Sequence, residues 1–263
     1  ASGVRLASTA RRLLLSPHLS ERLPLPQPLE VGSRVFDVVS DLAAYTQLPV
    51  ELVEELVQRR HDSFRAEWHE LPPRLRSDHW YYLSSRAYLF ANAIHLHETP
   101  EVLHAVEEAT RAGSHVLEFG GGTGNLALAL AALGRDVSYV ELSALQKDFV
   151  RFRVARYGLG ASVQIADWWL APPSGTFDAV VALDVFEHVA DLPRLLREQV
   201  APALRQGVVL IEASPFVRSL SNPMHPADVE LLDATLSEFV FRIDPSVPVP
   251  RVVPLATTRG TRP

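Results

Sequence analysis

The chain has 263 residues, 47% of them hydrophobic, and a mean hydropathy of +0.06, so we expect one sizeable globular core with room for an appended region. It has no cysteine, which excludes disulfides and thiolate metal sites, and a net charge of -6 with no basic cluster, which argues against duplex nucleic acid as a partner. No apolar run approaches the roughly 20 residues of a membrane-spanning helix. We therefore predict a cytoplasmic protein without a membrane span.

The first third of the chain predicts an extended segment followed by helices. Pro24, Pro26 and Pro28 favour extended backbone, so residues 1–34 are assigned to an N-terminal lead-in. From residue 35 to about 104, apolar residues recur at helical spacing, with an interruption at the LPPRL sequence and no obvious strand. We expect residues 35–98 to be a helical lid that covers a cleft and selects the substrate.

Aromatic and histidine residues concentrate at the end of this helical region. Tyr81, Arg86 and Tyr88 lie in the segment that would close the cleft, so we predict that they contact substrate, with core packing as the alternative. His95 and His97 are two residues apart, and on a helix their side chains would diverge by about 200°. We therefore predict no metal site.

Strand and helix signals alternate from residue 99 onward. A helix is expected to begin at Pro100 and to end before Gly113. This alternation predicts that residues 99–263 form an α/β domain, with a mostly parallel sheet covered by helices on both faces. Strands are expected at 115–119, 136–141, 161–167, 177–184 and 207–213, helices at about 125–133 and 143–158, and a terminal antiparallel hairpin from 239–243 and 251–258.

The sequence VLEFGGGTGN, at 116–125, lies where the first strand of this domain meets its helix. Ligands of parallel sheets bind at this edge, and Gly120, Gly122 and Gly124 lack the Cβ atoms that would keep a ligand from the backbone. A plain tight turn is the alternative. A dinucleotide site fits poorly, because Asn125 replaces the third small residue of its motif and Glu118 would repel a pyrophosphate. The carboxylate suits a cationic ligand.

Four motifs in order resemble those of the class I S-adenosylmethionine-dependent methyltransferases. They are VLEFGGGTGN, VSYVELS, QIADWW and FDAVVALDVFEHVADLPRLLRE, and the resemblance covers about residues 100–263. The D-x-x-E-H pattern in the last motif is similar to that of small-molecule methyltransferases related to the quinone-biosynthesis group. The resemblance implies a Rossmann-like sheet of seven strands, S-adenosylmethionine as cofactor and S-adenosylhomocysteine as product.

The resemblance also implies which residues hold the cofactor. Glu141 would accept hydrogen bonds from both ribose hydroxyls, and Asp167 one from the adenine amino group. Glu118 and the amides at Gly120 would hold the amino-acid end. The full predicted set is Glu118, Gly120, Gly122, Gly124, Glu141, Leu142, Asp167, Trp168 and Asp184.

Catalysis is harder to read, because methyl transfer depends on proximity and orientation more than on a fixed motif. An oxygen acceptor benefits from a general base, and His188 is a candidate because imidazole titrates near neutral pH. Bracing of the next helix is the alternative role. We predict methyl transfer to an oxygen, nitrogen or carbon atom of a small molecule or short peptide, and leave the oligomeric state open. The alternatives are a catalytically silent cofactor-binding regulator or scaffold and, less well matched, a nicotinamide-dependent oxidoreductase.

Overall fold

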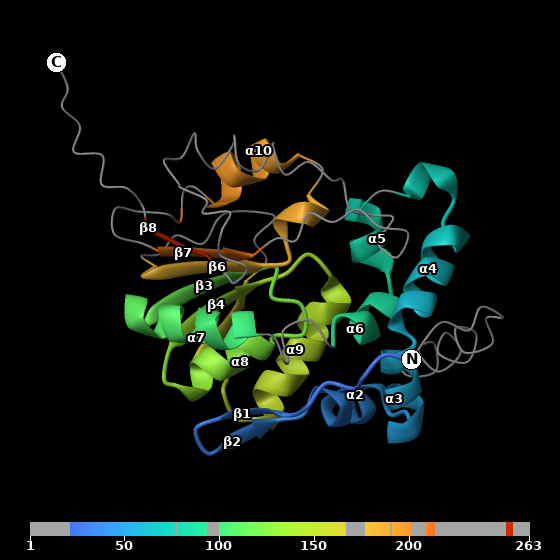
Figure 1. Cartoon of the computed structure of the whole chain (residues 1–263), viewed down its shortest axis with the longest axis horizontal. Coiled ribbons are helices and arrows are strands. Elements are labelled where there is room, and N and C mark those ends of the chain that lie inside the picture. The colour runs from blue at the N-terminus through green and yellow to red at the C-terminus, as the bar shows by residue number, and fades with distance from the viewer. Residues whose placement is uncertain are drawn as a thin grey trace.

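A six-stranded sheet forms the centre of the molecule, in the order β5-β4-β3-β6-β7-β8 (Figure 1). The structure is a computed structural model that describes residues 22–76, 78–93, 100–166, 177–189, 191–200, 203, 209–213 and 251–254. The five strands from β5 to β7 are parallel, and β8 pairs antiparallel with β7. The strands are β3 (His115–Phe119), β4 (Asp136–Val140), β5 (Val163–Ala166), β6 (Ala179–Leu183), β7 (Val209–Ala213) and β8 (Arg251–Pro254).

The predicted mostly parallel α/β domain is confirmed, and five expected strands form within two residues of their predicted bounds. Six strands lie in the described part of the sheet, and a seventh is not among them. Residues 239–243, the expected first half of the terminal hairpin, lie outside the described residues. The second half begins with β8, which pairs with β7.

Helices cover both faces of the sheet (Figure 1). One face packs against α7 (Pro100–Ala112), α8 (Asn125–Ala132) and α9 (Ala144–Arg156), and the other against α10 (Leu192–Leu195) and the π-helical η4 (Leu196–Val200). Along β6, Ala179 and Val181 belong to the first core, whereas Val180 and Ala182 belong to the second. A strand buried on both faces needs a continuous apolar run, which is why this segment reads AVVAL.

The N-terminal part contains a hairpin and a group of short helices. Its elements are β1 (Leu29–Val31), β2 (Arg34–Phe36), α2 (Val38–Thr46), α3 (Val50–Gln58), α4 (Arg60–Glu70), η1 (Pro73–Leu75), α5 (Asp78–Ser84) and α6 (Ala87–Ala91). No strand was expected from residue 35 onward, and this was wrong for residues 35 and 36, which belong to β2. The boundary expected after residue 34 falls inside the same strand. Strands of three residues are too short to show an alternating pattern, and Gly32, at φ +60°, turns the chain between them.

The N-terminal part shares its cores with the α/β domain. Leu29 and Phe36 of the hairpin belong to the cluster beneath β3, β4 and α8. Phe149 of α9 lies in a cluster with Leu42 of α2 and Val53 of α3. These elements therefore bury their apolar faces together, and the helical region is not an independent layer.

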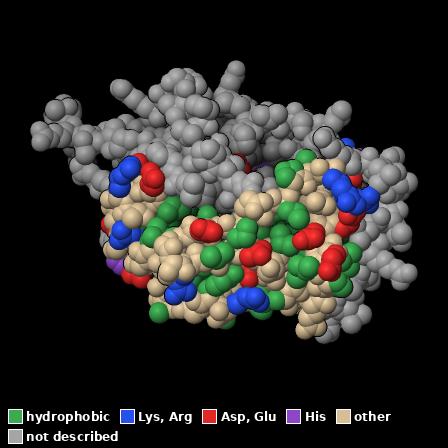
Figure 2. Space-filling view, turned by 60° about the horizontal axis from the view of Figure 1, so that its bottom comes forward, with side chains coloured by type: hydrophobic (Ala, Val, Ile, Leu, Met, Phe, Trp, Pro, Cys, Tyr) green, Lys and Arg blue, Asp and Glu red, His purple; other side chains and the backbone are tan. Residues whose placement is uncertain are grey.

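The surface is mixed in charge, as the composition predicts. Figure 2 shows acidic and basic side chains interspersed over the described part of one face. Within the described ranges, no helix has both the length and the apolarity needed to cross a bilayer.

Candidate active site

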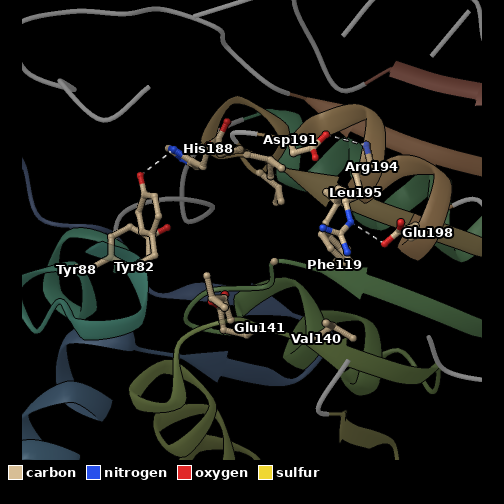
Figure 3. Close-up of a pocket in the computed structure, with 15 residues that line it drawn as sticks. Tyr82, Tyr88, Phe119, Val140, Glu141, His188, Asp191, Arg194, Leu195 and Glu198 are labelled. Atoms are coloured by element: carbon tan, nitrogen blue, oxygen red, sulfur yellow. Dashed lines mark hydrogen bonds and ion pairs between the residues drawn. The ribbon is translucent and has the colours of Figure 1, made fainter. Parts of the chain in front are cut away.

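A cavity of about 490 Å³ opens at the carboxyl ends of the parallel strands, within the range of about 300–1,000 Å³ that is usual for small-molecule sites (Figure 3). The strand ends, the segment after β6, and helices α5 and α6 all contribute to its wall. The lining residues are Tyr82, Tyr88, Phe119, Gly120, Val140, Glu141, Leu142, Asp184, Val185, His188, Val189, Asp191, Arg194, Leu195 and Glu198.

The glycine turn after β3 adopts a backbone that other residues rarely take. Gly120, Gly122 and Gly124 have φ values of +70°, +51° and +76°. The amides of Gly120 and Gly121 both donate to the carbonyl of Val140, at 2.8 and 3.2 Å, which ties the turn to the end of β4. The sequence therefore needs glycine here for the backbone conformation itself.

The missing Cβ atoms of this turn make room mainly for protein side chains. An added Cβ would collide with Val185 at Gly120, with Asn92 at Gly122 and with Val150 at Gly124. Gly120 lines the main cavity and Gly122 an adjoining small one, whereas Gly124 lines neither and is the N-cap of α8. Contact of a ligand with all three glycines stays a prediction.

Glu118 lies beneath the turn and is 2% exposed. Neither of its carboxylate oxygens has a side-chain hydrogen-bond partner in the part of the chain that the structure describes, and the backbone of Ala127 is the polar group that favours its charged form. Burial, and then the nearby charge of Glu141, raise the pKa of Glu118 well above its usual range. A carboxylate in this position is stabilised by a cationic or hydrogen-bond-donating ligand.

Glu141, at the end of β4, faces the cavity and is anchored by the backbone on both sides. Its Oε2 accepts from the amide of Gly122 at 2.9 Å and its Oε1 from the amide of Ser143 at 2.9 Å. Burial raises the pKa of this carboxyl, and the backbone hydrogen bonds oppose that effect. Each carboxylate oxygen accepts more than one hydrogen bond, so both remain able to receive a ligand hydroxyl.

Of the four other predicted cofactor residues, two line the cavity and two lie outside the described residues. Leu142 and Asp184 both line the cavity. Asp184 follows β6 with a φ of +52°. This backbone conformation is unusual for a residue with a Cβ, and such conformations recur at functional sites. Asp167 and Trp168 lie outside the described residues.

His188, which follows β6, directly contacts the helical region at the edge of the cavity. Its Nδ1 lies 2.8 Å from the hydroxyl of Tyr82, and the two ring centroids are 4.8 Å apart. Tyr88 packs edge-on against Tyr82 at 4.6 Å. Figure 3 shows this cluster on one side of the cavity and the Arg194–Glu198 ion pair, 2.9 Å from Nε to Oε2, on the other.

Of the three predicted lid residues, only Tyr88 lines the cavity. Tyr81 is fully buried, packs edge-on against Phe64 and Trp68, and has a pKa raised well above its usual value, mainly by burial. Arg86 is not part of the wall, and its backbone amide donates to Glu67 Oε1 at 3.0 Å. Neighbouring residues of a helix point about 100° apart, so α5 turns Tyr81 to the core and Tyr82 to the cavity.

Several residues of the site were missed from the sequence. Tyr82 belongs to the aromatic stretch from which its two neighbours were chosen, and only the helix orientation separates them. Asn92 approaches the turn from 30 residues earlier in the chain, with no local signal. Arg194 and Glu198 do carry a local sequence signal, because a spacing of four residues suits an ion pair on a helix.

Over the ranges that the structure describes, no group of three or more histidine, aspartate or glutamate side chains is placed to hold a metal ion. The histidines at 95 and 97 lie outside these ranges.

Comparison with known proteins gives a consistent result. A family profile described as a methyltransferase domain matches residues 82–224, more than half of the chain. Tuberculostearic acid methyltransferase UfaA1 of Mycobacterium tuberculosis is 40% identical over 77 residues, which are 29% of this chain and 18% of that protein. Ubiquinone biosynthesis O-methyltransferase of Xanthomonas oryzae pv. oryzae is 36% identical over 93 residues, which are 33% of this chain and 37% of that protein.

The matched segments thus span less than half the length of these curated relatives. Among solved structures, that of the mitomycin 7-O-methyltransferase MmcR has a TM-score of 0.50 at 17% identity, covering 82% of this chain and 72% of that one. At this identity the likeness shows a shared fold.

Proposed function

We propose that this chain, which belongs to the methyltransferase-domain family, transfers the methyl group of S-adenosylmethionine to a small-molecule or short-peptide acceptor. One observation carries the proposal. A single cavity joins the glycine turn and Glu141, which suit the cofactor, to a histidine–tyrosine pair on the opposite wall, which suits an acceptor.

The residues present fit the cofactor. The buried carboxylate of Glu118, with no side-chain partner for either oxygen among the described residues, suits the positive charge of the amino-acid end. Glu141 is oriented by two backbone amides and suits the ribose hydroxyls. Gly120, Leu142 and Asp184 line the cavity beside Glu141, whereas Glu118 is buried beneath the turn and is not one of the lining residues. The cofactor supplies a methyl group that its sulfonium already activates.

The protein's own contribution is to orient the acceptor, exclude water and handle a proton. Tyr82, Tyr88 and Val185 provide apolar contact surface in the wall. The His188 tautomer with its proton on Nδ1 donates to the hydroxyl oxygen of Tyr82, so its Nε2 is the atom that accepts a proton. A hydroxyl acceptor placed at Nε2 would lose its proton to His188 as the methyl group arrives.

An oxygen acceptor is the version we favour. Two of the similar proteins are named O-methyltransferases, and the candidate base faces the cavity. Nitrogen and carbon acceptors remain the other outcomes of an activity test.

Calorimetric titration with S-adenosylhomocysteine tests the cofactor assignment, with NAD⁺ in a parallel titration as the comparison. We expect binding of the first and none of the second. Glu141→Ala should weaken S-adenosylhomocysteine binding at least about tenfold, because it removes charge-assisted hydrogen bonds worth roughly 1.5–3 kcal/mol each. Unchanged affinity in a folded Glu141→Ala protein would contradict the ribose assignment.

A methyl-transfer assay with radiolabelled S-adenosylmethionine then tests turnover against a panel of phenols, amines and peptides. Transfer to a phenol that falls about 100-fold or more in His188→Ala, with cofactor affinity retained, would support the general-base role. Tight cofactor binding without transfer to any acceptor class would favour a silent binding protein.

A further inference from the structure

One buried ion pair links the N-terminal helices to the α/β domain. Arg153 of α9 donates from Nε to Oδ2 of Asp41 on α2 at 2.8 Å, and both side chains are fully buried. The hydroxyl of Tyr157 lies 3.0 Å from each oxygen of the same carboxylate. Arg156 approaches its Oδ1 at 3.2 Å from the surface.

The other end of the Arg153 guanidinium reaches the glycine turn. Its Nη1 donates to the carbonyl of Thr123 at 2.8 Å and to Oδ1 of Asn125. These two residues flank Gly124, the left-handed N-cap of α8. One planar, forked guanidinium group therefore connects a carboxylate on α2 to the backbone of the turn.

The turn needs such a support. Glycine loses more backbone freedom on folding than any other residue, and here three of them hold positive φ within five positions. A turn held in its binding conformation before the ligand arrives spends less of the interaction energy on ordering. A buried ion pair is a weak source of stability, but it can specify geometry where its partners lie on separate elements.

The surroundings of Asp41 make its orientation specific. Asp37 caps α2, accepting from the amides of Val39 and Ser40 at 3.0 and 3.1 Å, and so sets the direction of the helix. Phe36, which immediately precedes the cap, packs edge-on against Tyr157 at 4.8 Å. The orientation of Asp41 is thus fixed by the cap of its own helix, α2, and by its contacts with Arg153 and Tyr157.

We propose that Asp41 is a positioning residue for the cofactor-binding turn, acting through Arg153 on Thr123 and Asn125. The inference rests on the proposed function, because the ligand of the turn is taken to be S-adenosylmethionine. It assigns the N-terminal helices a part in cofactor affinity, in addition to their contacts with the acceptor side of the cavity.

The test compares Asp41→Asn with Arg156→Gln in the full chain. Both substitutions remove charge from the same network, but Arg156 is 44% exposed, does not reach the turn, and its contact is replaceable by water. We expect Asp41→Asn to raise the calorimetric Kd for S-adenosylhomocysteine at least about tenfold, and Arg156→Gln to leave it within about twofold. A merely structural role would lower the melting temperature and the binding stoichiometry, while the folded fraction kept its Kd.

An unchanged Kd in Asp41→Asn would overturn the proposal. Should that variant not fold, Tyr157→Phe removes only the hydroxyl that contacts the carboxylate, and it should weaken binding about threefold, within the effect of one hydrogen bond. Equal Kd values for Tyr157→Phe and Arg156→Gln would then count against the proposal.

Amide hydrogen exchange separates this inference from the proposed function. In the ligand-free protein, Asp41→Asn, or Tyr157→Phe in its place, should speed exchange at Gly122 and Gly124 relative to Arg156→Gln. Failure of the wild-type protein to bind S-adenosylhomocysteine would contradict the proposed function alone. Unchanged exchange at the turn would contradict the positioning role alone.

Discussion

The two sides of the cavity are built in different ways. On the strand side, backbone amides and carboxylates are fixed at the ends of β3 and β4, and the glycines keep an unusual backbone. On the helical side, Tyr82 and Tyr88 are placed by two short helices that pack against the domain. The strand side is fixed by the fold itself and so suits a ligand that proteins of this fold share. The helical side depends on how appended helices pack, and such segments differ between proteins of the same fold.

The largest effect should come from removing the helical side altogether. The sequence alone predicts that deletion of residues 1–98 leaves cofactor affinity within about tenfold, roughly 1.4 kcal/mol, and abolishes methyl transfer. The shared cores argue otherwise, because the deletion removes Phe36 and the other N-terminal residues of these cores. Truncation of a single buried phenylalanine typically costs about 3–5 kcal/mol, and the total free energy of unfolding of a protein is about 5–15 kcal/mol. We expect no cooperative unfolding transition by circular dichroism.

Deletion of residues 1–21 is the control, since it keeps every contact that the structure describes. A soluble 99–263 fragment that binds S-adenosylhomocysteine with an affinity close to that of the full chain would show that the strand side is self-sufficient.

A substitution in the turn should have the next largest effect. Gly122→Val places a β-branched residue at positive φ, at a cost of at least about 1–3 kcal/mol, and its Cβ collides with Asn92. We expect a lower melting temperature together with lost cofactor binding, rather than a purely local effect on the ligand. Thermal unfolding and calorimetry measure the two.

Gly134→Val is the matched control, because Gly134 has φ +76° but nothing within 4 Å of an added Cβ. It should show the backbone cost without the loss of binding. Equal losses of melting temperature in the two variants would mean that the contact with Asn92 is unimportant.

Glu118→Gln should separate stability from binding on the strand side. The folded-state pKa of Glu118 is raised, so protonation contributes stability that is fully present below the unfolded pKa of about 4.3 and is lost as the pH rises through the folded pKa. The neutral amide avoids this loss. Glu118→Gln should therefore be more stable than the ligand-free wild type at neutral pH, yet bind S-adenosylhomocysteine more weakly.

Denaturant titrations from pH 4 to pH 8 measure this difference. The gap between variant and wild type should widen as the pH rises. A gap independent of pH would indicate that Glu118 stays ionised in the folded protein.

The smallest effect should come from a single hydroxyl on the helical side. Tyr82→Phe removes the hydrogen bond to His188 and should lower kcat by about 2- to 12-fold, the equivalent of one net hydrogen bond, with cofactor affinity unchanged. Steady-state kinetics with a methylated acceptor would measure it. Tyr81→Phe, on the core side of the same helix, should leave kcat unchanged, and equal effects of the two would remove the reason to assign Tyr82 to the site.

The sequence by itself determined the parallel α/β domain, the glycine turn and the acidic residues beside it. These features are local. Apolar runs fit buried strands, glycine permits positive φ, and an acidic residue at the end of a predicted strand lies at the edge of the sheet where ligands bind. The predicted bounds of β3 and α8 agree with the structure for the same reason.

Only the tertiary structure decided what meets across the chain. The contact of Tyr82 with His188 spans 106 positions, and that of Asp41 with Arg153 spans 112. Such contacts depend on how helices pack, and a rotation of one residue along α5 exchanges the core-facing Tyr81 for the cavity-facing Tyr82. The sequence names the residue types available for the site, while packing selects which of them reach it.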